Sequence, residues 1–452
     1  MDIVIIGDGK VGHKLAMQLS SENCNVTLID QSEKKLSDAV NEMDVSCVAG
    51  DGGSAEVQKK ADVPGADLVI ACTSTDEMNL FCCLLARRLG AKQTIARVRN
   101  PIYAGQMHLL KEDLKLSMAV NPELALAEEI SRVLIFPSAA KIETFAKGRV
   151  ELVEVLLTEK SVIKGVPLSG LYKKYQIKML ICAVQRGREV YIPDGNFVLE
   201  AGDKINIAAS HKEIEKFFRL TNSMRNKAKN VMICGGGRVA YYLSRQLLSL
   251  GMQVKIVEQN EARCLELCEL LPKATVIHGN ATDHELLEEE EIEKADAFVT
   301  LTGMDEENII MSMYAKMRGV PKIVTKVNDE GLENMVGQLG MESVVSAKDV
   351  TANVITGYVR AMRNSMGSAN VETVYKLVGG KIEALGFLIK EKTKYTGIPL
   401  KDLTLKRNHL VACIVRKGKI IIPGGEDTLE VGDNVIVVSM AQGLEDLKDI
   451  MR

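Results

Sequence analysis

The N-terminal stretch of the chain places a Gly-x-Gly-x-x-Gly turn between two short apolar runs. The run Ile3–Ile6 precedes the turn Gly7–Gly12, a segment with helical periodicity follows, and the run Val26–Ile29 ends on Asp30. Strand, glycine-rich turn, helix, strand and terminal acid is the order that a dinucleotide-binding βαβ unit requires. A chain that begins this way is expected to build an open, mostly parallel sheet.

Each glycine of this turn has a physical role. Gly7 allows the tight turn, Gly9 lets the backbone approach a diphosphate, and Gly12 lets the helix pack closely on the strand. The phosphates would lie at the start of the helix, where free N–H groups and the helix dipole favour an anion. Asp30 follows Gly9 by 21 residues, a distance at which an acid accepts hydrogen bonds from a ribose 2′-hydroxyl. Because Asp30 would repel a 2′-phosphate, the pattern favours NAD over NADP.

Composition narrows the possible functions. With 452 residues, 46% hydrophobic and 26% charged, the chain is expected to form about two to four globular domains. Its 57 basic and 60 acidic residues include no basic run that would predict a nucleic-acid partner. No apolar stretch approaches the roughly 18 residues that cross a bilayer, and the start lacks a signal peptide, so we expect a cytoplasmic protein. The ten cysteines form no Cys-x-x-Cys pair and are expected to be core thiols, with no metal site.

The order of apolar runs and helical segments predicts the domain type. Short strands alternating with helices indicate a parallel, doubly wound sheet in the first part of the chain. We expect strands at 45–48, 67–72 and 94–98, helices at 33–42 and 76–89, and a further helix that begins at Asn121-Pro122. From residue 151 the pattern changes to short β-strands, at 151–158, 180–185, 189–192 and 204–208, followed by a helix near 212–218.

The same order of motifs then occurs a second time in the sequence. Gly235-Gly236-Gly237-Arg238-Val239-Ala240 repeats the first turn 228 positions later, and Glu258 repeats Asp30 at the same offset. Three further positions correspond in order: Asp51, Thr73 and Arg97 match Asn280, Thr302 and Lys326. The β-rich part recurs as well, because Gly165–Leu168 matches Gly397–Leu400 and Leu199–Asp203 matches Leu429–Asp433.

The repeat predicts four domains from one duplication. The fold class is α/β, with two Rossmann-like doubly wound parallel-sheet domains, each followed by a small α+β, β-rich domain. The predicted boundaries are 1–138 and 229–366 for the parallel-sheet domains, and 139–222 and 367–452 for the β-rich domains. The polar and basic segment Thr221–Lys229 is interpreted as a linker.

Several candidate residues keep two interpretations. Asp51 would cap the next helix or contact the adenine, and the hydroxyls of Thr73, Ser74 and Thr302 would contact a ligand or cap helices. Arg97 and Lys326, each at the end of a strand, would neutralise phosphates or join salt bridges. The helices that start near Pro122 and Ser346 would pack on their own cores or join the two copies. His13, which Tyr241 replaces in the second copy, is expected to be a surface or cap residue.

These repeated motifs resemble the TrkA family, the cytosolic regulatory subunits of Trk potassium uptake systems, whose chains carry tandem RCK N and C domains. The resemblance covers nearly the whole chain. In the first copy it implies as ligand-binding positions Gly7, Asp8, Gly9, Lys10, Val11, Asp30, Asp51, Thr73, Ser74 and Arg97. In the second copy it implies Gly235, Gly236, Gly237, Arg238, Val239, Glu258, Thr302 and Lys326.

The resemblance also implies a function. It implies NAD(H) as ligand with ATP or ADP as possible competitors, a homotetrameric ring, and docking at the inner face of the membrane to a potassium transporter subunit such as TrkH. Such a subunit gates potassium uptake and is not an enzyme. The alternatives are an NAD-dependent dehydrogenase and a stand-alone nucleotide sensor. A dehydrogenase would need an acid or base near the nicotinamide, and the β-rich domains offer only His211 and His409, at unrelated positions.

Overall fold

A computed structural model describes the chain except for residues 23, 111–112, 136–138, 146–148, 160, 222–227, 340, 342, 366–370, 379–380, 441–443, 445 and 452. Most of the expected linker at 221–229 therefore lies outside the described residues. The chain divides into two compact units. The first comprises Met1–Ile130, Asn230–Gly319 and Val324–Thr356, and the second comprises Ser131–Lys229, Val320–Ile323 and Gly357–Arg452.

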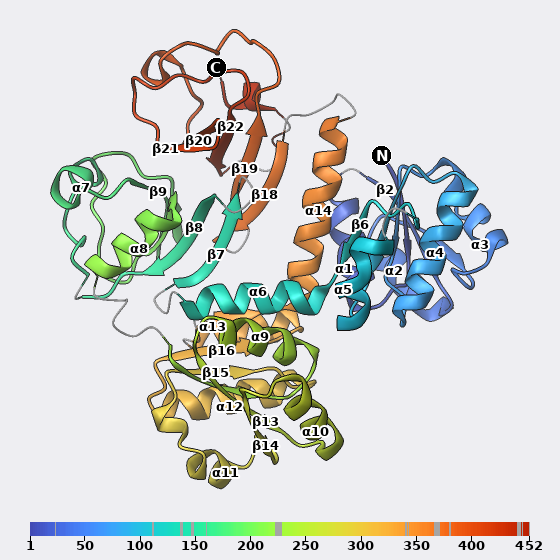
Figure 1. Cartoon of the computed structure of the whole chain (residues 1–452). Helices are drawn as coiled ribbons and strands as arrows, with labels where there is room; N and C mark the ends of the chain where they lie inside the picture. Colours follow the sequence, from blue (N-terminus) through green and yellow to red (C-terminus); the bar gives the residue numbers. More distant parts are fainter. Residues whose placement is uncertain are drawn as a thin grey trace. The chain divides into compact units, whose positions relative to one another are not determined.

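The first unit contains a six-stranded parallel sheet in the order β3-β2-β1-β4-β5-β6. Figure 1 labels its strands β2 and β6 and the helices around them. Its strands are β1 (Asp2–Ile6), β2 (Asn25–Asp30), β3 (Ser46–Ala49), β4 (Leu68–Ala71), β5 (Gln93–Arg97) and β6 (Met118–Val120). The helices are α1 (Lys10–Ser20), α2 (Glu33–Glu42), α3 (Ala55–Lys60), α4 (Asp76–Leu89), α5 (Pro101–Leu110) and α6 (Pro122–Ile135), with a 3-10 turn at Val63–Gly65.

The residues of β1 explain its central place. Ile3, Val4, Ile5 and Ile6 are all buried, as a strand covered on both faces requires. β1 pairs with β2 on one side and with β4 on the other, so that Ile3 faces Val26 and Leu68. The strand order therefore reverses beside the carboxyl end of β1, where open α/β sheets bind their ligands.

The second half of this unit repeats the sheet, in the order β14-β13-β12-β15-β16-β17. The strands are β12 (Asn230–Cys234), β13 (Gln253–Glu258), β14 (Thr275–His278), β15 (Ala297–Thr300), β16 (Lys322–Lys326) and β17 (Ser343–Val345). The helices are α9 (Arg238–Ser249), α10 (Glu261–Leu270), α11 (His284–Glu289), α12 (Asp305–Met317), α13 (Glu330–Gln338) and α14 (Ala347–Ser365), with a 3-10 turn at Ile292–Lys294.

The second unit contains two five-stranded antiparallel sheets. The first has the order β10-β9-β11-β8-β7, and its elements are β7 (Ala139–Phe145), β8 (Val150–Leu156), α7 (Leu168–Tyr175), β9 (Met179–Arg186), β10 (Glu189–Tyr191), β11 (Lys204–Ser210) and α8 (His211–Leu220). The second has the order β18-β19-β22-β20-β21, with strands β18 (Val371–Leu377), β19 (Ile382–Leu388), β20 (His409–Arg416), β21 (Lys419–Ile421) and β22 (Asn434–Ser439), and with 3-10 turns at Leu400–Asp402 and Leu447–Ile450.

One core cluster joins the two antiparallel sheets. It includes the buried thiols of Cys182 and Cys413, with Ala208 from the first sheet and Ile436 from the second. All ten cysteines are free, and most are buried, so they act as small core residues.

The predicted fold class is confirmed. Three helices or strands of the first parallel-sheet domain, α3, α5 and β6, were not predicted from the sequence, and neither were the helix α7 and the edge strand β7. β7 pairs on one side only, with β8, and so needs no continuous apolar run to mark it.

Candidate functional site

The first glycine turn connects β1 to α1 at the carboxyl edge of the sheet. Gly7 has a φ of +102°, and a Cβ there would lie 2.9 Å from the carbonyl oxygen of Cys72. A Cβ on Gly12 would lie 1.9 Å from the carbonyl oxygen of Gly7. At Gly9 a Cβ would meet nothing within 4 Å. Two glycines are therefore required by the turn itself, and the third borders open space.

The helices that follow the two turns begin without a side-chain cap. The N-cap residues of α1 and α9 are Gly9 and Gly237, and neither helix start has a side-chain cap hydrogen bond in the described part of the chain. Ser32, Thr75 and Asn260, by contrast, cap α2, α4 and α10 through their side chains. The first N–H groups of α1 and α9 remain available, together with the positive end of the helix dipole, for an anionic ligand.

An acid is held beside each open helix start. Asp30, at the end of β2, accepts hydrogen bonds from the backbone N–H of Asp8 at 2.8 Å and of Ser32 at 2.9 Å. In the second copy, Glu258 accepts from the backbone N–H of Gly236 at 2.6 Å and of Asn260 at 2.7 Å. Each carboxylate is thus fixed at its glycine turn and keeps further lone pairs for a ribose hydroxyl.

Thr73 and Arg97 meet beside the first turn, where β4 and β5 end. The guanidinium of Arg97 donates to the carbonyl of Thr73, and Arg99 donates to the carbonyl of Ser74. Burial lowers the pKa of Arg97, and the neighbouring charge of Arg99 lowers it further. Thr75, rather than Thr73 or Ser74, caps α4, which removes the cap interpretation for these two residues.

The second copy repeats this corner with Thr302 and Lys326. The ammonium of Lys326 lies 3.4 Å from the carbonyl oxygen of Leu301, and burial lowers its pKa. Lys10, in the first glycine turn, lines one pocket with Gly303, the residue that follows Thr302, and its charge also lowers the pKa of Lys326.

An asparagine that the sequence reasoning did not place in the site organises each corner. The side-chain oxygen of Asn79 accepts from the Thr73 backbone N–H at 2.6 Å and from the Thr73 hydroxyl at 2.8 Å, while its amide donates to the Arg97 carbonyl at 2.9 Å. Asn308 makes the same three bonds to Thr302 and Lys326, at 3.0, 2.9 and 3.0 Å. An asparagine at matched positions inside two helices was the available signal, because asparagine is a poor helix former.

Asp51 lies in the loop after β3, at the same edge of the sheet. Its carboxylate accepts from the backbone N–H of Gly53 at 2.8 Å, and Asn280 accepts likewise from the N–H of Thr282 at 3.0 Å. Both side chains shape their own loop and do not cap the next helix, since the N-cap residue of α3 is Ser54 and that of α11 is Asp283.

The helices near Pro122 and Ser346 contact the other copy of the parallel-sheet domain. Asn121, before α6, donates to the hydroxyl of Tyr242 on α9 at 2.9 Å. Asp349, in the first turn of α14, lies 3.2 Å from the ammonium of Lys14 on α1. Each glycine-turn helix is thereby joined to the helix that leaves the opposite copy.

A pocket of about 990 Å³ lies between the two copies in the first unit. The first copy contributes the turn residues Asp8, Gly9 and Lys10, and the second contributes the loops around Gly303 and Asn328. The pocket therefore borders the first candidate site on one side and, on the other, the loops that follow Thr302 and Lys326 of the second copy.

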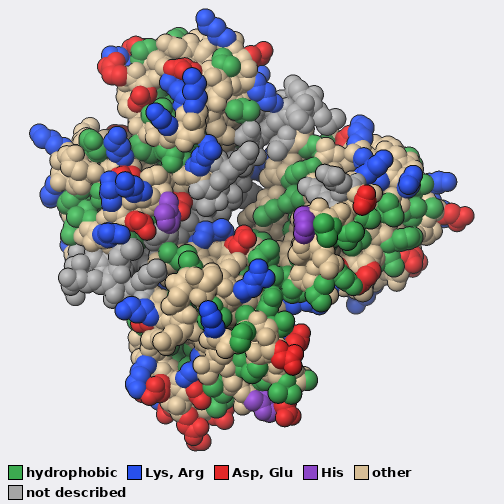
Figure 2. Space-filling model, in the orientation of Figure 1, with side chains coloured by type: hydrophobic (Ala, Val, Ile, Leu, Met, Phe, Trp, Pro, Cys, Tyr) green, Lys and Arg blue, Asp and Glu red, His purple; other side chains and the backbone are tan. Residues whose placement is uncertain are grey.

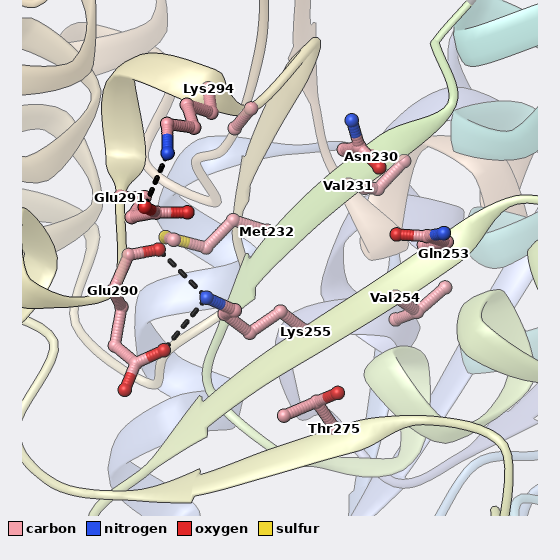
Figure 3. A pocket seen from close by; sticks show the side chains of 11 residues that line it. Asn230, Val231, Met232, Gln253, Val254, Lys255, Thr275, Glu290, Glu291 and Lys294 are labelled. Atoms are coloured by element: carbon pink, nitrogen blue, oxygen red, sulfur yellow. Dashed lines mark hydrogen bonds and ion pairs between the residues drawn. The ribbon is translucent and has the colours of Figure 1, made fainter.

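A second pocket, of about 260 Å³, lies at the opposite edge of the second sheet, along the amino-terminal parts of β12, β13 and β14 (Figure 3). Lys255 crosses it and donates to the carbonyl and the carboxylate of Glu290, both at 2.7 Å, while Lys294 pairs with Glu291. Its charged residues are engaged with one another, and no candidate site residue lines it.

Two further features, a metal-binding cluster and a membrane-spanning helix, are absent from the described residues. No group of three or more His, Cys, Asp or Glu side chains is placed to hold a metal ion. None of the described helices combines the length and the apolar character needed to cross a bilayer.

Comparison with models of known protein families shows to which family the chain belongs. The model of the TrkA-N domain matches residues 3–122 and 231–347, and the model of the TrkA-C domain matches residues 152–222 and 385–452. The chain belongs to the TrkA family. The resemblance inferred from the repeated motifs is confirmed, and both copies of both domains are matched.

Relatives of this TrkA-family chain align over its whole length. The Trk system potassium uptake protein TrkA homolog of Archaeoglobus fulgidus is 31% identical, over 100% of both chains. The TrkA homolog 1 of Methanosarcina mazei is 30% identical, over 99% of both chains.

Solved structures share the fold at low identity. The GsuK RCK domain has a TM-score of 0.63 at 17% identity and covers 98% of this chain and 93% of its own. The GsuK channel bound to NAD has a TM-score of 0.64 at 17% identity, over 98% of this chain and 77% of its own. The GsuK bound to ADP has a TM-score of 0.50 at 15% identity, over 80% and 69%. The TrkA-family chain thus has the fold of the RCK domains.

Proposed function

We propose that this TrkA-family chain is the cytosolic regulatory subunit of a Trk-type potassium transporter. It binds NAD(H), and ATP or ADP in competition, at the two glycine turns, and through them controls potassium uptake by a TrkH-like membrane subunit. A nucleotide that binds one state of the assembly better than another shifts the equilibrium toward that state.

The observation that carries the proposal is the matched pair of uncapped helix starts, each with a fixed acid beside it. Asp30 is held by the N–H of Asp8, and Glu258 by the N–H of Gly236. The uncapped helix start suits a diphosphate, and the acid beside it suits a ribose hydroxyl. That fold neighbours were solved with NAD and with ADP supports these ligand classes, and the names of the relatives support the role in potassium uptake.

Exposed apolar helix faces support self-assembly, which we propose to be a homotetramer. On α12, Ile310, Met313 and Met317 are 59%, 41% and 83% exposed and lie along one face. Phe81 on α4 and Ile102 on α5 are 52% and 65% exposed in the first copy. Figure 2 shows apolar side chains gathered over α4 and α5. Exposed apolar patches of this kind mark protein contacts.

We also propose that the chain is not an enzyme. Hydride transfer to or from nicotinamide needs a positioned acid or base. Of the two histidines in the antiparallel-sheet domains, His211 is paired with Glu151 at 2.7 Å, and burial lowers the pKa of His409. Oxidation of NADH in the presence of a panel of carbonyl substrates, followed by absorbance, would contradict this part of the proposal.

The test is potassium flux into liposomes that hold the membrane partner and this chain. NAD⁺, NADH, ATP and ADP are added to wild type, Asp30→Ala and Glu258→Ala, with Glu56→Ala, an exposed acid on α3, as the matched control. We expect flux to respond to nucleotide in wild type and in the control, and the response to weaken in the two site variants. An unchanged flux at saturating nucleotide would refute regulation by this route.

A further inference from the structure

A chain of three side chains links the first glycine turn to α1 and α2. Nδ1 of His13 lies 3.1 Å from a carboxylate oxygen of Asp8, and Nε2 of His13 lies 3.0 Å from a carboxylate oxygen of Glu42. The Asp8 side chain is 1% exposed, His13 is 30% exposed and Glu42 is 54% exposed. The imidazole therefore bridges a buried acid in the turn and an outer acid at the end of α2.

The two contacts of His13 are not equally satisfied by the charged and the neutral forms of an imidazole. An ionised carboxylate only accepts hydrogen bonds, and only the imidazolium form of histidine donates from both ring nitrogens. Both contacts are satisfied when His13 is charged, and one is lost when it is neutral. Because an imidazole changes charge between about pH 5 and pH 8, this connection depends on pH in the physiological range.

The loss of the proton affects Asp8 directly. Burial raises the pKa of Asp8, the charge and hydrogen bond of His13 lower it, the charge of Asp30 raises it, and that of Lys35 lowers it. Without the imidazolium, Asp8 and Asp30 form a less compensated negative pair beside the N-terminus of α1. An anionic ligand at that helix start then binds more weakly.

The other charged groups around His13 leave this conclusion unchanged. The same pocket is lined by Lys10, Lys14, Lys35 and Lys348 and by Asp38, Asp305, Glu306 and Asp329, four charges of each sign. Lysine, aspartate and glutamate side chains ordinarily keep their charge between about pH 6 and pH 8, whereas histidine is the residue type that ordinarily changes charge in this range.

The second site lacks all three members of the chain. Gly236, Tyr241 and Leu270 stand where Asp8, His13 and Glu42 stand, at the offset of 228. A Cβ on Gly236 would lie 2.6 Å from a methyl carbon of Leu267 and 3.0 Å from a carboxylate oxygen of Glu258, so an acid there would have to displace Leu267 and would lie against a second carboxylate. Arg263 instead donates to the carbonyl of Gly236 at 2.7 Å.

We propose that His13 is a positioning residue that makes nucleotide binding at the first site pH-dependent and leaves the second site without this dependence. The affinity of the first site for an adenine dinucleotide falls as pH rises, and binding there takes up a fraction of a proton. The two sites of one chain thereby respond differently to the same nucleotide when pH changes. This inference rests on the proposed nucleotide binding.

The test is titration calorimetry with NAD⁺, whose diphosphate keeps its charge over this range. Glu258→Ala reports the first site and Asp30→Ala the second. In Glu258→Ala we expect the affinity to fall about fivefold from about pH 6 to about pH 8, the size of one added charge at partly screened distance. Proton uptake, measured in two buffers of different ionisation enthalpy, is expected there and not in Asp30→Ala.

Variants of the Asp8–His13–Glu42 bridge distinguish an effect of His13 on nucleotide binding from an effect on folding. His13→Gln in the Glu258→Ala background should bind weakly at both pH values and take up no proton. The double change Asp8→Gly, His13→Tyr introduces the residues of the second copy and should also give an affinity that does not change with pH. Thermal unfolding shows whether each variant folds. If His13→Gln does not fold, the double variant replaces it in the test.

The outcomes are distinct. A pH profile unaltered by His13→Gln, or the same profile at both sites, overturns the role of His13 alone. Absence of NAD⁺ binding to wild type and to both single-site chains at every pH overturns the proposed function and this inference with it.

Discussion

The side-chain amide of Asn121 donates a hydrogen bond to the hydroxyl of Tyr242 at 2.9 Å and so joins the two parallel-sheet domains. Asn121 also accepts from the backbone N–H of Leu124 at 2.9 Å and thereby caps α6. Tyr242 lies on α9, one turn after Arg238 at the second glycine turn. Through this pair, the helix that starts at one candidate site contacts the cap of the helix that leaves the other copy.

Removing this contact should loosen the joint between the domains. Tyr242→Phe deletes the hydroxyl and leaves the Asn121 amide without its nearest acceptor, at an expected cost of about 1–2 kcal/mol in the free energy of unfolding. Urea denaturation measures it. Tyr241→Phe, the neighbouring tyrosine, is the matched control and should change stability by less than about 0.5 kcal/mol. Equal effects of the two changes would contradict the role given to this bond.

Substitutions at two glycines of the first turn should affect ligand binding and stability differently. Gly9 has a φ of −88° and open space at its Cβ position, so Gly9→Ala should cost less than about 1 kcal/mol of stability. The added methyl projects where a diphosphate would approach, and we expect NAD⁺ affinity at the first site to fall at least about tenfold. Calorimetry in the Glu258→Ala background measures it.

Gly12→Ala provides the contrasting change. Its methyl would press on the carbonyl of Gly7, so we expect stability to fall by about 1–3 kcal/mol. If Gly9→Ala binds NAD⁺ as tightly as the unsubstituted turn, the ligand does not approach at this place.

The exposed faces of α4 and α12 should be required for self-assembly. Phe81→Lys and Ile310→Lys each place a charge on an apolar face, and we expect the mass of the assembly, measured by light scattering, to decrease. Leu265→Lys is the control, because Leu265 is 65% exposed but lies on α10. A decrease with Leu265→Lys alone would assign the contact to another face.

An ion pair between a buried acid, Asp203, and a half-buried arginine, Arg186, should make the first antiparallel domain sensitive to pH. The guanidinium of Arg186 donates to both carboxylate oxygens of Asp203 at 2.8 Å, and the backbone N–H of Glu200 donates to one of them at 2.9 Å. Burial by itself would raise the pKa of Asp203, but these hydrogen bonds and the charge of Arg186 outweigh it, and the pKa is lowered. The stabilisation from a lowered acid pKa is present at neutral pH and is lost as pH falls through the folded-state value.

Arg186→Met tests this pair. The buried carboxylate would lose its partner, and we expect the free energy of unfolding to drop by about 3 kcal/mol near pH 7. Near about pH 5 the drop should be smaller, because the unpartnered carboxyl takes up a proton more readily. Urea denaturation at both pH values measures the difference, with Arg188→Met, an exposed arginine on the adjoining turn, as control. An equally large loss at both pH values would argue against a charge-based effect.

The sequence alone determined the duplicated architecture and the edge of the sheet at which ligands are expected. Ile3–Ile6 form a continuous apolar run because a central parallel strand is covered on both faces, and that pattern is visible without coordinates. The spacing from Gly9 to Asp30, repeated from Gly237 to Glu258, reflects one strand–helix–strand unit, so local order along the chain was sufficient.

Only the tertiary structure decided which side chains meet. Glu42 lies 29 residues from His13, and Tyr242 lies 121 residues from Asn121. The local sequence pattern around each residue does not indicate which distant residue it contacts. The contacts of Thr73 with Asn79 and of Asp51 with Gly53 show that neither residue caps the next helix, while contact of the two with a ligand stays a prediction. Periodicity records which face of an element is buried, whereas a polar contact depends on where the chain returns in space.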